Sequence, residues 1–116
     1  MDAVTVAREY YRAWTGKDMD AAMALVADDV VCDAPAGRIE GAAAYRAFLA
    51  PFAEMLHGAT LLASFGDDDT AVLVYDTETP LVHSAPGAEY VRVVDGRITY
   101  SRFVFDRAPF IAARAG

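Results

Sequence analysis

Four side chains in this 116-residue sequence could take part in proton transfer: one tyrosine and three carboxylic acids. Tyr10 lies in an apolar helical stretch and Asp33 precedes the turn segment APAG, while Asp76 and Glu89 interrupt apolar, strand-like segments. A carboxyl group among apolar side chains has a raised pKa, so it can act as a base near neutral pH or, when protonated, as a donor. A phenol beside it could donate a hydrogen bond to a developing oxyanion. The four residues predict acid–base chemistry in a pocket, with Tyr10 as donor, Glu89 as donor or base, and Asp33 or Asp76 as base, and they leave the reaction itself open.

The alternation of the segment AEYVRVV places Glu89 on the same side as Val91 and Val93. We therefore expect its carboxyl group to face an apolar interior, where desolvation raises its pKa toward neutrality. The alternative is an acid at the end of a strand that pairs with Arg92 or Arg102.

Asp76 has two possible orientations. It shares the alternation of Val72 and Val74, so it joins Glu89 if that face of the strand is the inner one. Periodicity does not choose between the faces, because Ala71 and Leu73 are apolar as well. If the other face is the inner one, the interior is lined instead by Tyr75, Thr77 and Thr79.

Tyr10 and Asp33 also have purely structural interpretations. Tyr10 shares the apolar face of its helix with Trp14 one turn later, which is typical of core packing with a satisfied hydroxyl group. Asp33 occupies a position at which aspartate commonly caps a turn.

The bulk properties exclude several classes of partner. A formal net charge of −7 repels nucleic acid. No apolar stretch approaches the roughly 20 residues that cross a bilayer, and the first residues lack the basic start and cleavage site of a secretory signal. The single cysteine, Cys32, cannot form an internal disulfide, and metal-ligand spacing is missing. We expect one domain over residues 1–116, in the cytoplasm, with no cofactor, metal, nucleic acid or membrane as partner.

The elements that must position the four residues follow from changes in periodicity. Three helical segments come in the first half, at residues 2–18, 19–27 and 42–57, with a brief strand VVCD between the second and the third. In the second half, two hairpins turn at GDDD and at Asp95-Gly96, the latter a strong hairpin signal. This order predicts an α+β fold, in which a cone-shaped, curved antiparallel sheet packs against three N-terminal helices and encloses a hydrophobic cavity.

Three stretches together resemble the nuclear transport factor 2-like superfamily, which includes SnoaL-like polyketide cyclases, ketosteroid isomerases and limonene epoxide hydrolases. They are YYRAWTGKDMDAAMALVADDVVCDAP, GRIEGAAAYRAFL and AEYVRVVDGRITYSRFVFD, and they cover nearly the whole chain in the family's order. The resemblance is specific for the fold. It is weak for function, because this fold supports isomerases, hydrolases, cyclases, dehydratases and non-catalytic modules.

The resemblance assigns roles one position at a time. Tyr10 matches the tyrosine that donates to the oxyanion in ketosteroid isomerases, and Glu89 matches their second, protonated donor, which is an aspartate there. The general base of those enzymes falls on Ala34, one residue after Asp33, and only a bulge would return Asp33 to the interior. The terminal-strand acid of the epoxide hydrolases falls on Phe103.

The sequence therefore predicts a cofactor-free isomerase, cyclase or lyase for a small hydrophobic carbonyl compound, such as a steroid-like or polyketide-like molecule. The wall of its cavity is expected to be shaped by Trp14, Phe48, Phe103 and Phe105. Two alternatives stay open: a non-catalytic dimeric module that binds a small ligand or a partner, and an epoxide hydrolase variant. A homodimer is expected because one apolar sheet face must be covered. We expect Leu73, Tyr75, Val93 and Phe103 to lie on that face.

Overall fold

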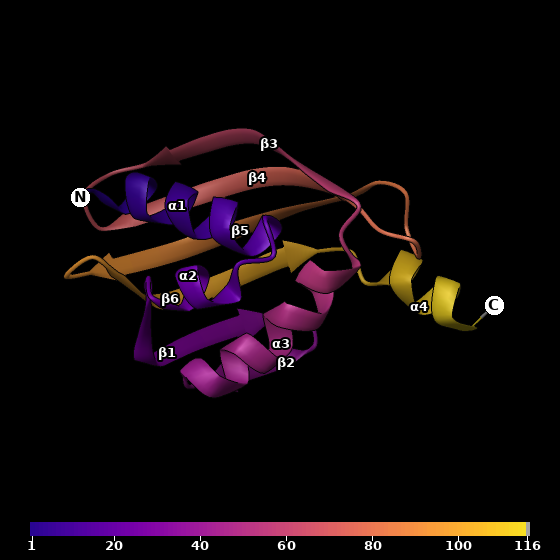
Figure 1. Ribbon diagram of the computed structural model, residues 1–116, viewed down its shortest axis with the longest axis horizontal. Coiled ribbons are helices and arrows are strands. Elements are labelled where there is room, and N and C mark those ends of the chain that lie inside the picture. Colours follow the sequence, from indigo (N-terminus) through magenta and orange to yellow (C-terminus); the bar gives the residue numbers. More distant parts are fainter. Residues whose placement is uncertain (116) are drawn as a thin grey trace.

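The computed structural model describes residues 1–115, which form four helices and six strands (Figure 1). The helices are α1 (Ala3–Thr15), α2 (Met19–Met23), α3 (Ala42–Met55) and α4 (Ala108–Ala115). The strands are β1 (Val26–Ala34), β2 (Gly37–Glu40), β3 (Gly58–Gly66), β4 (Thr70–Glu78), β5 (Ala85–Val94) and β6 (Arg97–Phe105).

The six strands make one curved sheet in the order β2-β1-β6-β5-β4-β3. Helices α1, α2 and α3 lie against one face of this sheet, and α4 lies beyond its end (Figure 1). This architecture confirms the predicted α+β class. One detail of the prediction is wrong: β1 and β6 run parallel, so the sheet is not purely antiparallel.

The predicted brief strand at residues 30–33 is longer than expected and belongs to a hairpin. β1 starts at Val26, turns through Pro35 and Ala36, and returns as β2 from Gly37. The turn segment APAG thus joins two paired strands rather than ending one. The other predicted hairpins are confirmed, and Asp95 and Gly96 both have the positive φ angles, 51° and 77°, that a tight two-residue turn requires.

Local capping fixes where the first two helices begin. The Asp2 carboxylate accepts a hydrogen bond from the Thr5 backbone N–H at 2.9 Å, and Asp18 accepts one from the Ala21 N–H at 3.1 Å. These bonds satisfy N–H groups that have no partner within their own helix. The stripe of α1 that includes Tyr10 and Trp14 is buried.

The structure shows which side chains of β4 and β5 face the helices and which face outward. Burial along β4 alternates so that Ala71, Leu73, Tyr75 and Thr77 face the helices, whereas Asp76 faces outward. On β5, Glu89 faces inward as predicted.

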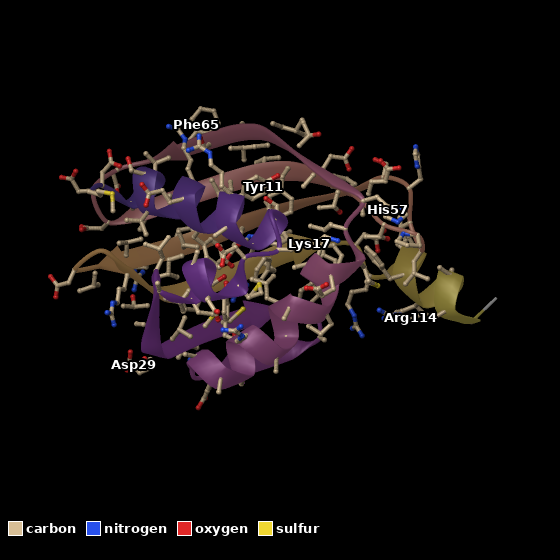
Figure 2. The ribbon with its side chains drawn as sticks, in the orientation of Figure 1. Tyr11, Lys17, Asp29, His57, Phe65 and Arg114 are labelled. Atoms are coloured by element: carbon tan, nitrogen blue, oxygen red, sulfur yellow. The ribbon has the colours of Figure 1, made fainter. Side chains whose placement is uncertain are left out.

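The residues expected on an uncovered apolar face are in fact covered within the chain. Leu73, Tyr75, Val93 and Phe103 are all buried, because this is the face on which the helices pack. The opposite face carries other apolar side chains instead, among them Val104, which is 59% exposed. Phe65, which is 70% exposed, projects from the edge strand β3 (Figure 2). Among the helices of residues 1–115, none is long and apolar enough to cross a membrane.

Candidate active site

Glu89 lies at the centre of a fully buried polar cluster on the inner face of the sheet. Its Oε2 atom accepts hydrogen bonds from the hydroxyl groups of Tyr10 at 3.0 Å, Tyr45 at 2.9 Å and Ser101 at 2.6 Å. These donors come from α1, α3 and β6, so three elements that are distant in sequence converge on one carboxyl oxygen. We refer to Tyr10, Tyr45, Glu89 and Ser101 as the Glu89 cluster.

The second oxygen of the same carboxyl group, Oε1, has a different environment. Oε1 is buried and has no hydrogen-bond partner among the described residues. An unpaired buried oxygen disfavours the ionised form, and burial raises the pKa of Glu89 to about 7 although the three hydroxyl groups act in the opposite direction. Near neutral pH the carboxyl group is therefore present in both protonation states, and Oε1 is the atom that can exchange a proton.

The two phenols remain protonated under the same conditions. Burial, followed by the negative charge of Glu89, raises the pKa of both Tyr10 and Tyr45 well above the usual range. Their hydroxyl oxygens also contact each other, so both phenols lie at the same side of the Glu89 carboxyl group. The cluster consequently presents donors around a titratable acid, which is an arrangement suited to proton transfer.

An aromatic pocket adjoins the cluster. Its free volume is about 50 Å³. It is lined by Trp14, Phe48, Leu49, Phe52, Tyr75, Thr77, Ala85, Gly87, Phe103, Phe105 and Phe110. All four residues predicted to shape the wall, Trp14, Phe48, Phe103 and Phe105, are in this set.

Phe103 links the pocket to the Glu89 cluster. It is the partner of Glu89 in the pairing of β5 with β6, and its ring stacks on Tyr45 with centroids 6.4 Å apart. Phe103 lines the pocket, whereas Glu89 does not. A ligand in the pocket is therefore next to the cluster but does not contact the carboxyl group of Glu89.

Asp33 lies on the opposite face of the sheet from the Glu89 cluster. The pairing of β1 with β2 is regular from Val31 to Ala34, so no bulge turns Asp33 inward. Its carboxylate accepts a 2.6 Å hydrogen bond from Tyr100 and lies 3.4 Å from Arg102 and 3.9 Å from Arg38. The Tyr100 hydrogen bond, aided by the two guanidinium groups, lowers the pKa of Asp33. We refer to these four residues as the Asp33 group.

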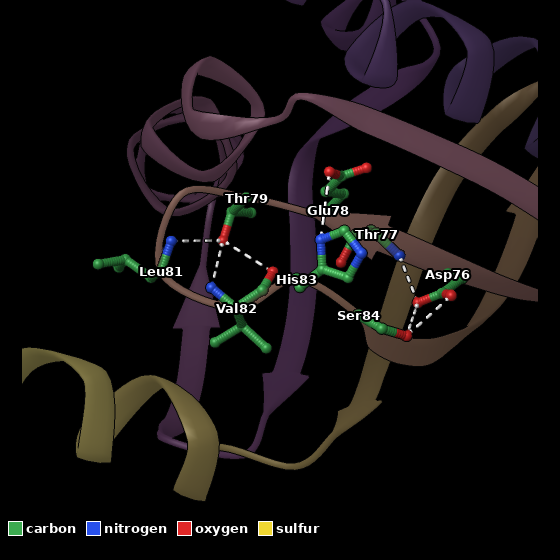
Figure 3. Close-up of polar contacts among 8 residues, drawn as sticks. All are labelled: Asp76, Thr77, Glu78, Thr79, Leu81, Val82, His83 and Ser84. Atoms are coloured by element: carbon green, nitrogen blue, oxygen red, sulfur yellow. Dashed lines mark hydrogen bonds and ion pairs between the residues drawn. The ribbon is translucent and has the colours of Figure 1, made fainter.

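Asp76 also lies outside the cluster, at the end of the sheet where β4 runs into the following loop (Figure 3). It accepts hydrogen bonds from the Ser84 hydroxyl at 3.0 and 3.1 Å, and from the Thr77 backbone N–H at 2.9 Å. Nearby, His83 Nδ1 lies 3.3 Å from Glu78. These contacts hold the loop against the strand end, and they do not connect Asp76 to Glu89.

Sequence reasoning missed two members of the cluster, Tyr45 and Ser101. A signal for each is present in the sequence. Ser101 has the same alternation as Phe103, which makes it a polar residue on an otherwise apolar strand face. Tyr45 begins a stripe with Leu49 and Ala53 at a spacing of four residues, so it lies on the buried face of α3.

A model of the SnoaL-like domain family matches residues 7–101. The chain belongs to the SnoaL-like domain family. The predicted resemblance to the nuclear transport factor 2-like superfamily is thereby confirmed. No curated protein matches the chain.

Solved structures agree with this membership. A crystal structure of a Kribbella flavida DSM 17836 protein is 56% identical, covers 97% of this chain and 93% of its own, and has a TM-score of 0.96. A nuclear transport factor 2-like protein of unknown function from Cytophaga hutchinsonii is 17% identical over 96% of both chains, with a TM-score of 0.81. A second K. flavida protein, named as a candidate ketosteroid isomerase, is 23% identical over 89% of this chain and 76% of its own, with a TM-score of 0.74. The two distant structures share the fold of this SnoaL-like domain.

The SnoaL-like domain has no gathering of three or more His, Cys, Asp or Glu side chains within residues 1–115 that could hold a metal ion. Cys32 pairs with Ser101 in the register of β1 and β6. Burial raises the pKa of the Cys32 thiol to about 12, so it stays protonated. The titratable group of the interior with a pKa near neutrality is Glu89.

Proposed function

We propose that this SnoaL-like domain is a cofactor-free proton-transfer enzyme, of the isomerase, cyclase or lyase type, for a small hydrophobic carbonyl compound. The observation that carries the proposal is the unpartnered Oε1 atom of Glu89, in a carboxyl group with a pKa of about 7. A second K. flavida protein with the same fold is named as a candidate ketosteroid isomerase, which adds support.

In the proposed reaction, ionised Glu89 takes a proton through Oε1 from the carbon next to the substrate carbonyl. The electron pair of the broken C–H bond moves toward the carbonyl oxygen and forms an enolate. Tyr10 can donate to this oxyanion, because Tyr45 and Ser101 still hold Oε2. In an isomerase, Glu89 then returns the proton to another carbon of the substrate. Asp33 and Asp76 receive no role in this scheme, since both lie on the outer face.

The aromatic pocket supplies the binding site. Its walls suit an apolar ring, and side chains must rearrange for the reacting carbon to reach Oε1, because Glu89 does not line the pocket. An apolar surrounding strengthens both the proton transfer and the oxyanion hydrogen bond, because no water competes for them.

Glu89→Gln tests the proposal with a β,γ-unsaturated ketone as substrate. General acid–base catalysis is worth about 10²–10⁴-fold, so the variant should lose about that factor in kcat. The wild-type rate should rise with pH through an apparent pKa of about 7, since the ionised carboxylate is the base. Glu78→Gln, on the exposed end of β4, is the matched control and should keep the wild-type rate. Equal rates in the wild type and Glu89→Gln would reject the assignment.

A second function is favoured by one observation: Glu89 does not line the pocket. A non-catalytic module that binds a small hydrophobic ligand needs the pocket but not the carboxyl group. If the domain is such a module, the wild type and Glu89→Gln should bind ring compounds with the same affinity. Neither form should convert any of these compounds.

We also propose that the domain forms a homodimer through its outer sheet face. Apolar side chains on this face include Val104, Val72 and Val74, of which Val104 is mostly exposed. Sedimentation of the protein should give twice the mass of one chain, and a monomer at micromolar concentration would reject the dimer.

A further inference from the structure

The C-terminal helix α4 is attached to the domain through one side chain. Among its eight residues, Ala108–Ala115, Phe110 is buried and the others are exposed. The helix lies beyond the end of the sheet, away from the layer formed by α1, α2 and α3 (Figure 1). Helices shorter than about 12–15 residues are marginal without tertiary support. The position of α4 thus depends on Phe110.

The Phe110 ring is part of the aromatic pocket. It makes edge contacts with Phe52 and Phe105, at centroid distances of 6.0 and 6.2 Å and interplanar angles of 71° and 86°. The other aromatic rings of the pocket come from α1, α3, β4 and β6, which form the body of the fold. Phe110 is therefore the pocket ring that can leave without disturbing the core.

The free volume of the pocket is too small for a ring-sized ligand. It amounts to about 50 Å³, whereas an apolar cavity that binds benzene measures about 150 Å³. An entering ring must displace a side chain that already occupies this space. Departure of the Phe110 phenyl group would vacate a volume of the required shape, bounded by Phe52 and Phe105.

We propose that the pocket binds a single-ring apolar ligand whose ring takes the place of the Phe110 ring, so that α4 is a lid that Phe110 holds closed. This inference rests on the proposed function only in taking the pocket as the ligand site, and it does not require catalysis. Only the open molecules can bind a ring, so the apparent Kd equals the Kd of the open form divided by the fraction of molecules that are open.

Toluene is a suitable probe, because Trp14 is the single tryptophan of the chain and lines the pocket. Binding is followed by Trp14 fluorescence and checked by calorimetry. Phe110→Ala should bind toluene about tenfold more tightly than the wild type, as expected when the competing closed state is removed. Ile111→Ala, a truncation of an exposed side chain on the same helix, is the matched control and should bind like the wild type. Equal or weaker binding by Phe110→Ala would show that Phe110 is a wall of the site, and would overturn the proposal.

Hydrogen exchange on the wild-type protein gives a second readout that needs no substitution. Toluene should increase the exchange rate of the α4 amides, because the ligand drives Phe110 out of the pocket. Slower exchange in α4 on binding would mean that the helix closes over the ligand, and would overturn the proposal. Tight toluene binding with no turnover of any ketone would reject the proposed enzyme and leave the lid intact.

Discussion

The Glu89 cluster and the Asp33 group use similar parts on opposite faces of one sheet. Each centres on a carboxyl group that accepts a 2.6 Å hydrogen bond from a hydroxyl group, Ser101 in one and Tyr100 in the other. The outcomes are nevertheless opposite: the pKa of Glu89 is raised to about 7, and the pKa of Asp33 is lowered. Hydrogen bonding alone therefore does not determine the acidity of either group.

The difference comes from burial and from neighbouring charge. Glu89 is completely buried and has only neutral hydroxyl groups as partners, so the cost of desolvating its charge dominates. The side chain of Asp33 is 26% exposed and has two arginines within 4.0 Å, so little opposes the effect of its hydrogen bond. The interior thus creates a group that can exchange protons at neutral pH, while the surface creates one whose ionised form is favoured.

The largest effect expected from the difference between Glu89 and Asp33 is on how the stability of the protein depends on pH. The folded-state pKa of Glu89 lies above its ordinary value of 4.5, so the folded protein binds more protons than the unfolded chain between these two values. The free energy of unfolding should consequently fall as pH rises from about 4.5 to about 7, by about 3 kcal/mol if this group acts alone. Urea denaturation across this range measures the effect, and Glu89→Gln should abolish it.

Asp33→Asn provides the matched control from the outer face. Because the pKa of Asp33 is lowered, its contribution is present above its ordinary pKa of 3.8 and is lost as pH falls through the folded value. The variant should therefore keep the fall in stability between pH 4.5 and 7. A wild-type protein with constant stability over that range would contradict the assigned burial of the Glu89 charge.

A smaller effect, on the pKa of each carboxyl group, is expected when its 2.6 Å hydrogen bond from Ser101 or from Tyr100 is removed. Ser101→Ala should raise the pKa of Glu89 further, and Tyr100→Phe should raise that of Asp33 toward its ordinary value, because both bonds favour the ionised form. A hydrogen bond to a charged group contributes about 1.5–3 kcal/mol, so Ser101→Ala should raise the pKa of the buried Glu89 carboxyl group by about one or two. Carboxyl NMR titration of the two variants measures both shifts, and a fall in either pKa would contradict the account.

Periodicity predicted the inward direction of Glu89, because three alternating positions of β5 agree. It could not do so for Asp76, since both faces of β4 carry apolar residues and only the packing of the helices distinguishes them. For Asp33, the one-residue offset from Ala34 was visible in the sequence, but its consequence depended on whether β1 contains a bulge at that point. The regular pairing with β2 settles that point.

Other features depended on long-range contacts. Tyr45 and Ser101 are 56 residues apart, and only the packing of α3 on β6 brings both to Glu89. The short segment around Phe110 carries no amphipathic pattern long enough to identify a helix, and its attachment depends on a pocket assembled from several elements. Local pattern thus predicted most elements, whereas the composition of the site required the tertiary structure.

The central claim is most directly tested by measuring the pKa of Glu89 itself. Carbon-13 NMR of the side-chain carboxyl group, assigned with Glu89→Gln, follows its titration in the folded protein. The expected midpoint of this titration is about 7. A midpoint near the ordinary value of 4.5 would mean that water or an unrecognised charge reaches Oε1, and would contradict the proposed chemistry.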